Sequence, residues 1–141
     1  MLAVTHIITS AAIGAQVSST PFAFSLAFLF HLFLDTLLHW NIYIDKHRWP
    51  YFWVVVDVLG GLLATYWLTS EQFFSTPMLA AVLGGNLPDI TAGISDLLKR
   101  SKGGFLRFHE GIQNETSSPW KGLRWQVALV ALSVWTISSR G

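Results

Sequence analysis

The chain has 141 residues, of which 52% are hydrophobic and only 12% are charged, with a formal net charge of +1. Soluble domains carry about 25% charged residues, so this composition argues against an ordinary soluble domain and favours an integral membrane protein built as one domain. The sequence contains no cysteine, which excludes disulfides and thiolate metal sites and leaves nitrogen and oxygen atoms as ligands for any metal.

Long apolar runs separated by short polar turns predict an all-α bundle of five helices in a single membrane-embedded domain, residues 1–141. The expected helices cover about 2–17, 22–42, 51–69, 77–98 and 120–138, and a polar loop covers 99–119. Three of these runs begin at or just after a proline, which the first helical turn tolerates: Pro21, Pro50 and Pro77. The runs are too long and too uniformly apolar for strands.

The basic residues gather on one side of the predicted bundle. With five spans, the N-terminus, the 43–50 loop and the 99–119 loop share one side of the membrane. Eight of the nine basic residues fall on that side or at its flanks: Lys46, Arg48, Lys99, Arg100, Lys102, Arg107, Lys121 and Arg124. Only Arg140 falls on the other side. This asymmetry predicts that the shared side, with the N-terminus, is cytoplasmic. The basic loop is too small to indicate nucleic-acid binding.

The segment FHLFLDTLLHW, residues 30–40, places His31, Asp35 and His39 four residues apart. In a helix these side chains share one face, and ionisable groups are unfavourable in hydrocarbon. Either they form hydrogen bonds between helices or they bind a metal, with zinc favoured over manganese or iron. Because a helix separates His31 from His39 by about 12 Å, either two of the three bind one ion, or Asp35 bridges two ions.

Further ionisable residues fall at similar depth in the cytoplasmic half of the predicted bilayer. At about 1.5 Å of rise per residue, Asp57 lies roughly 10 Å and Asp89 about 13 Å from that surface. His6 lies near the start of the first predicted helix and His109 in the 99–119 loop. The predicted metal ligands are therefore His6, His31, Asp35, His39 and Asp89, and the predicted catalytic residues are Asp57, as general base, and His109.

Each of these residues also has a structural interpretation. His6 can be an interfacial histidine, and Asp57 can be a supporting partner rather than a base or a ligand. Asp89 can satisfy a helix break at Pro88, and His109 can belong to a solvated loop instead of a lid over the site. Asp45 and His47 are predicted to be ordinary loop residues.

The stretch GGNLPDI, residues 84–90, adds a backbone feature. Pro88 removes a helical hydrogen bond, and Gly84 and Gly85 offer little resistance to a break. We therefore predict a kink that presents Asn86 and Asp89 to the interior of the bundle. A second glycine pair, residues 60–61, is suited to close approach between helices.

The segments THIITSAAIGA, HLFLDTLLHW and GGNLPDI resemble those of the prokaryotic predicted membrane-bound metal-dependent hydrolases. These are small inner-membrane proteins distantly likened to the all-α zinc-dependent phospholipase C fold. His6 matches the early Thr-His of that pattern, and residues 85–89 match its Gly-x-Leu-Pro-Asp element. A His-Arg…Thr-His-Ser stretch of the better-known branch is missing here, and His31, Asp35 and His39 are expected to replace its ligands.

The resemblance and the residues together predict a prokaryotic inner-membrane protein that contacts membrane lipid and hydrolyses its substrate with a divalent metal. A site at leaflet depth favours a phospholipid or another amphiphilic phosphoester as substrate. The alternative function is a non-enzymatic protein that handles metal ions or protons, since the same groups can form a relay. A purely structural bundle is the third interpretation.

Overall fold

The computed structural model describes residues 1–42 and 48–139, without the side chain of Glu71. Residues 43–47, which include Asp45, Lys46 and His47, lie outside the described part, as do residues 140–141 with Arg140. The described chain is helical and contains no strand, which confirms the predicted all-α class. Its elements are α1 (Ala3–Gln16), α2 (Thr20–Thr36), α3 (Pro50–Thr69), the 3₁₀ helix η2 (Ser70–Phe74), α4 (Thr76–Leu97), α5 (Gly104–Ile112) and α6 (Pro119–Ser138).

Helix boundaries follow the prolines. A proline occupies the first or second position of α2, α3, α4 and α6, where its missing N–H leaves no helical hydrogen bond unmade. The fifth proline, Pro88, lies inside α4, and the helix continues through it. The kink predicted at this position stays a prediction, because a helix can bend at a proline and remain helical. Asn86 and Asp89, which the kink was expected to present to the interior, both line a cavity.

Two boundaries differ from the prediction. The second predicted helix, 22–42, ends at Thr36, because Leu37 adopts an extended conformation. The predicted polar loop 99–119 contains the amphipathic helix α5. The two differences are linked: Asn114, just beyond α5, donates its backbone N–H to the Asp35 carbonyl and its side-chain amide to the Thr36 carbonyl. These bonds satisfy carbonyls that a longer α2 would have used.

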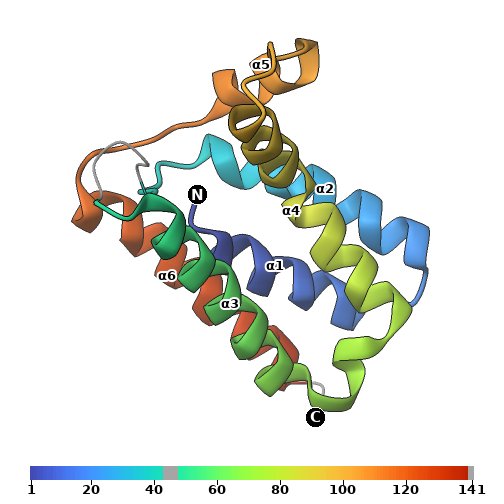
Figure 1. Cartoon of the computed structure of the whole chain (residues 1–141). Helices are drawn as coiled ribbons and strands as arrows, with labels where there is room; N and C mark the ends of the chain where they lie inside the picture. Colours follow the sequence, from blue (N-terminus) through green and yellow to red (C-terminus); the bar gives the residue numbers. More distant parts are fainter. Residues whose placement is uncertain (43–47, 140–141) are drawn as a thin grey trace.

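Helix α1 lies at the centre of the bundle and packs against α2, α3, α4 and α6 (Figure 1). Small residues allow this packing. A Cβ atom on Gly61 of α3 would lie 2.9 Å from the Cα of Val4, and a Cβ on Gly14 would lie 2.8 Å from the Cα of Met78. A Cβ on Gly85 of α4 would collide with the Ser10 hydroxyl. The helix backbones therefore approach one another as closely as glycine permits.

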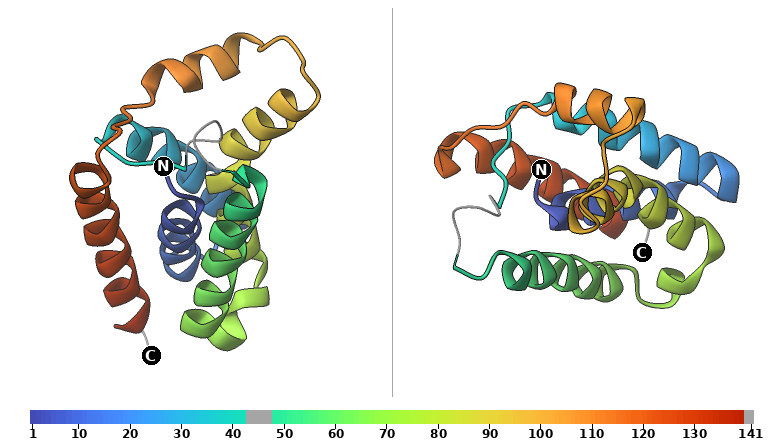
Figure 2. Two further views of the ribbon diagram at one scale, coloured as in Figure 1. Left: turned by 60° about the vertical axis from the view of Figure 1, so that its left-hand side comes forward. Right: turned by 45° about the horizontal axis from the view of Figure 1, so that its top comes forward.

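Helix α5 lies across the end of the bundle where the N-terminus is found (Figures 1 and 2). It packs on α2 and α4, and the chain that follows it pairs with the chain that follows α2. His39 donates its backbone N–H to the Asn114 carbonyl, and Thr116 donates to the His39 carbonyl. Lys102, ahead of α5, forms ion pairs with Asp96 and Glu110, which raise its pKa. These contacts fix α5 over the ends of α2 and α4.

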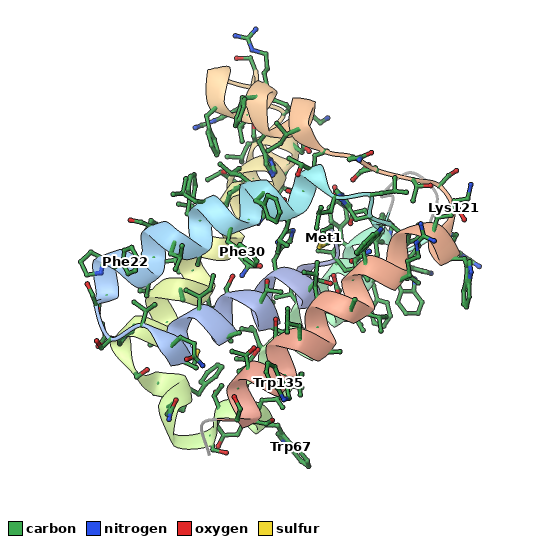
Figure 3. All side chains as sticks on the ribbon, turned by 180° about the vertical axis from the view of Figure 1, so that it is seen from behind. Met1, Phe22, Phe30, Trp67, Lys121 and Trp135 are labelled. Atoms are coloured by element: carbon green, nitrogen blue, oxygen red, sulfur yellow. The ribbon has the colours of Figure 1, made fainter. Side chains whose placement is uncertain are left out.

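Polar side chains fill much of the interior, and large apolar side chains cover much of the outside. Among the described residues, 13 buried side chains are polar or charged and 10 are hydrophobic. Exposed side chains include Trp67 (85%) and Trp135 (68%), which lie at the end of the bundle opposite Lys121 (Figure 3). Water-soluble proteins show the reverse distribution of buried residues.

One helix of the described part, α3, is long and apolar enough to cross a membrane by length and composition. Only 17% of its most apolar window is buried within the bundle, so most of its apolar surface faces away from the other helices. Helix α2 is apolar but has only 17 residues.

Candidate metal centre

Four side chains from three helices converge beneath α5. His31 and Asp35 come from successive turns of α2, Asp89 comes from α4 and His109 comes from α5. The Nε2 atoms of His31 and His109 each lie 3.0 Å from Asp35 Oδ2, and they lie 3.1 Å from one another. Asp89 Oδ1 lies 3.7 Å from the nitrogen of His31 and 3.6 Å from that of His109. These four atoms form one compact group.

The spacing of this group fits a metal ion. Zinc binds imidazole nitrogen and carboxylate oxygen at about 2.0–2.2 Å, so neighbouring ligand atoms of a tetrahedral site are separated by roughly 3.3–3.6 Å. The five distances given above, 3.0 to 3.7 Å, bracket that value. His31, Asp35 and His109 are buried, and Asp89 is about one-third exposed. Together, the four residues can hold a metal ion.

The hydrogen bond at Nδ1 suits His31 to the role of a ligand. Its Nδ1–H donates to the Gly85 carbonyl over 2.7 Å, which turns Nε2 toward Asp35 and Asp89, where it can offer a lone pair to a metal ion. Ligating histidines commonly fix their second nitrogen in this way. Without a cation or a proton, two lone pairs of imidazole and carboxylate atoms would face each other at 3.0 Å, an arrangement that a positive charge relieves.

His6 of α1 approaches the opposite side of the two carboxylates. Its Nε2 lies 3.2 Å from Asp35 Oδ1 and 3.9 Å from Asp89 Oδ2, and the Met1 amino nitrogen lies 3.3 Å from the same Asp35 oxygen. The His6 ring stacks on that of His31 with centroids 3.9 Å apart. His6 is buried, and its Nδ1 has no hydrogen-bond partner among the described residues.

His39 does not join the four-residue group as a ligand. The sequence predicts that it continues the helical face of His31 and Asp35, but α2 ends before it. Its Nδ1 lies 2.8 Å from the Leu37 carbonyl and its Nε2 lies 3.0 Å from the side-chain carbonyl of Gln113. Burial lowers the pKa of His39, outweighing the Leu37 carbonyl, which acts in the opposite direction. His39 therefore supports the site through Gln113.

Asp57 caps the start of α1. Its two carboxylate oxygens accept the backbone N–H groups of Ala3, at 2.6 Å, and Val4, at 3.2 Å. A carboxylate at this position satisfies donors that have no partner within the helix and interacts favourably with the helix dipole. These contacts favour the structural interpretation of Asp57, and its predicted role as general base stays a prediction.

A cavity of about 660 Å³ opens beside Asp89, lined by residues of α1, α3 and α4. Its polar lining includes Asp57, Asn86 and Asp89, and its walls are mainly apolar: Ile7, Val54, Val58, Leu62, Leu79 and Leu83. Helices α3 and α4 each pack on α1, which forms the inner wall of the space between them. One of the four candidate ligands, Asp89, thus lies on the wall of a mainly apolar cavity.

Gln113 is a site residue that the sequence analysis did not single out. Its side-chain NH₂ donates to Asp35 Oδ2 at 2.9 Å and lies 3.1 Å from His109 Nε2. The sequence does offer one signal: Gln113 follows His109 by four residues, and in a helix this spacing places both side chains on one face. That signal was hidden because residues 99–119 were interpreted as a loop.

No protein-family model, curated protein or solved structure matches this chain.

Proposed function

We propose that this chain is a membrane-embedded, metal-dependent hydrolase that acts on the phosphoester of an amphiphilic molecule, a phospholipid in the first instance. The convergence of four ligand atoms from α2, α4 and α5, one of which also lines a mainly apolar cavity, carries the proposal. The motif resemblance to prokaryotic membrane-bound hydrolases agrees with it.

Placement in a membrane is supported by the distribution of side chains. The outward surface of α3 is apolar over the length of a bilayer core, and histidine, aspartate and glutamine side chains are inside. Trp67 and Trp135 lie at one end of the bundle and Lys121 lies at the other (Figure 3), as interfacial aromatic residues and cytoplasmic basic residues would. We propose a prokaryotic inner membrane, with the α5 end cytoplasmic.

The chemistry follows from the ligand types. His31, Asp35, Asp89 and His109 would hold the ion, with zinc expected first and manganese or iron as alternatives for this carboxylate-containing set. A divalent ion supplies Lewis-acid polarisation of a phosphoryl oxygen and hydroxide near neutral pH. The Gln113 amide donates to Asp35 Oδ2 and orients that carboxylate, and it lies against His109 Nε2. Phe105, stacked on His109 with centroids 6.3 Å apart, shields that histidine from water.

The cavity supplies the preference for an amphiphile. Its apolar walls suit an acyl chain, and Asp89 lies both on the cavity and in the ligand group. A substrate whose chain lies between α3 and α4 would therefore place its polar head near the candidate metal centre. A small water-soluble phosphoester would gain nothing from these walls.

The test begins with metal content. Elemental analysis of the purified full chain in detergent should find a stoichiometric divalent metal, reduced strongly by His31→Ala. Hydrolysis is then measured on phosphoesters of increasing acyl length, and activity should rise with length. Absence of metal from the wild-type chain, even after incubation with zinc or manganese, would overturn the proposal. Stoichiometric metal without hydrolysis of any phosphoester would favour the metal-handling alternative.

Adjacent leucines on α3 give a matched test of the cavity. Leu62 lines the cavity, and Leu63 does not line it and is 63% exposed. Leu62→Trp should lower activity on long-chain substrates several-fold with little effect on a short one, whereas Leu63→Trp should leave both unchanged. Equal effects of the two variants would remove the cavity from the proposal.

A further inference from the structure

We propose a second metal position beside the first, formed by His6 Nε2, Asp35 Oδ1 and Asp89 Oδ2, so that the two carboxylates bridge a pair of ions. The inference rests on the metal centre of the proposed function and extends it from one ion to two. It assigns a ligand role to His6, which lies outside the four-residue group.

The first observation is the way Asp35 divides its oxygens. Oδ2 faces the Nε2 atoms of His31 and His109, each at 3.0 Å. Oδ1 faces the Nε2 atom of His6 at 3.2 Å. A carboxylate that binds one ion needs imidazole ligands beside only one of its oxygens. A carboxylate that bridges two ions presents one oxygen to each of them. Asp35 is fully buried, so its oxygens depend on protein groups and not on solvent. Besides the imidazoles, the Met1 amino nitrogen lies 3.3 Å from Oδ1 and the Gln113 amide donates to Oδ2.

Asp89 divides its oxygens in the same sense. Oδ1 lies 3.7 Å from His31 Nε2 and 3.6 Å from His109 Nε2, while Oδ2 lies 3.9 Å from His6 Nε2. The two carboxylates come from different helices, α2 and α4, yet each presents one oxygen to the His31–His109 side and the other to the His6 side. Two independent side chains therefore define the same two positions.

The spacing of the histidine rings indicates how far apart the two metal positions lie. The rings of His6 and His31 stack with centroids 3.9 Å apart and an interplanar angle of 26°. Each presents its Nε2 to a different oxygen of Asp35. Ions in two-metal hydrolytic sites are about 3.5–4 Å apart, so nearly parallel imidazoles at this spacing are placed as ligands of neighbouring ions.

The charge of the assembled site is consistent with the proposed substrate. Two carboxylates neutralise one divalent ion. The charges of the second ion and of the Met1 amino group beside Asp35 Oδ1 stay uncompensated, so an anionic phosphoester and hydroxide would supply the balance. The second position has three side-chain ligands against four for the first. We therefore expect it to bind its ion more weakly and to be completed by solvent or substrate oxygen.

A single-ion arrangement makes a different prediction. There, His6 donates its Nε2–H to Asp35 Oδ1 and stabilises that carboxylate without binding metal. Each chain would then bind one ion at every metal concentration below the one at which nonspecific binding begins. The number of ions and their magnetic coupling therefore distinguish the two arrangements.

The experiment uses the full chain in detergent micelles, stripped with chelator and titrated with Mn²⁺. Wild type should bind two ions in successive steps, and the low-temperature paramagnetic resonance spectrum should change from an isolated to a magnetically coupled signal as the second step fills. His6→Ala and the bulkier His6→Gln should bind one ion and show only the isolated signal. The wild-type spectrum decides the matter even if both variants fail to fold.

Thr9→Val is the matched control, since Thr9 is buried on α1 and, within the described part of the chain, its hydroxyl bonds only to the Thr5 and His6 carbonyls. This variant should keep both ions and the coupled signal. One uncoupled ion in wild type, or two coupled ions retained in His6→Ala, would overturn the second position and leave the proposed hydrolase intact. No bound ion in wild type would overturn both.

Discussion

Gln113 holds two members of the candidate site at once, which gives it a testable role. Its amide group contacts both Asp35 and His109, and loss of such supporting hydrogen bonds typically weakens metal binding 10–100-fold. We expect Gln113→Leu to retain the metal stoichiometry and to lower affinity by about that factor, measured by competition with a chelator. The exposed Arg107→Ala on the same helix is the control and should leave affinity unchanged.

Thr65 carries a buried hydroxyl that makes no hydrogen bond among the described residues. An unsatisfied buried hydroxyl disfavours the folded state by about 1–3 kcal/mol. We therefore expect Thr65→Val, which keeps the shape, to raise the free energy of unfolding by about 1 kcal/mol in a denaturant titration in micelles.

Thr69 provides the comparison one turn later on α3. Its hydroxyl donates to the Thr65 carbonyl over 2.8 Å, so Thr69→Val should bring no such gain. If both valine variants stabilise equally, general apolarity rather than the unsatisfied hydroxyl is responsible.

In helix α3, one glycine of the pair Gly60–Gly61 lies close against α1 and the other does not. A Cβ on Gly61 would meet the backbone of Val4 and the side chain of Ile7, whereas a Cβ on Gly60 would meet nothing within 4 Å. We expect Gly61→Ala to push α3 away from α1 and to lower thermal stability clearly. Gly60→Ala should be neutral or stabilising by up to about 1 kcal/mol, the difference in helix propensity. Equal loss in both variants would contradict this account of the α1–α3 contact.

Most helices were predictable because their signals are local. Apolar runs and prolines predicted α1, α3, α4 and α6 to within a few residues, and His31, Asp35 and Asp89 were predicted as ligands that the structure brings together. The end of α2 was not predictable from residues 22–42 alone. It depends on Asn114 and Thr116, nearly 80 positions away, which pair with the chain beyond Thr36.

Helix α5 escaped prediction for a different reason. Its 9 residues include Gly104, Arg107, Glu110 and Gly111, and so short a helix is marginal alone and forms through tertiary packing. The assignment of His109 as a catalytic residue followed from its apparent loop position. With α5 formed, the His109 Nε2 atom lies 3.0 Å from Asp35 Oδ2. This position favours a role for His109 as a metal ligand.

Across the whole molecule, the lack of cysteine makes membrane topology directly testable. Single cysteines can be introduced at Phe74, which is exposed at the end of η2, and at Lys121, near the α5 end of the bundle. In intact cells an impermeant maleimide should label Phe74→Cys and not Lys121→Cys, and after lysis it should label both. Labelling of both in intact cells would contradict a spanning bundle, and the opposite pattern would reverse its orientation.

The separation of the ligands along the chain has a consequence for the order of assembly. His31 and His109 are 78 positions apart, and Gln113 is 78 positions from Asp35. During synthesis, helices α1 to α4, which carry His6, His31, Asp35 and Asp89, leave the ribosome first. The cluster cannot form until α5 follows with His109. Under the proposed function, metal capture would therefore be a late step in biogenesis, and chains arrested before residue 109 would lack one candidate ligand of the first ion.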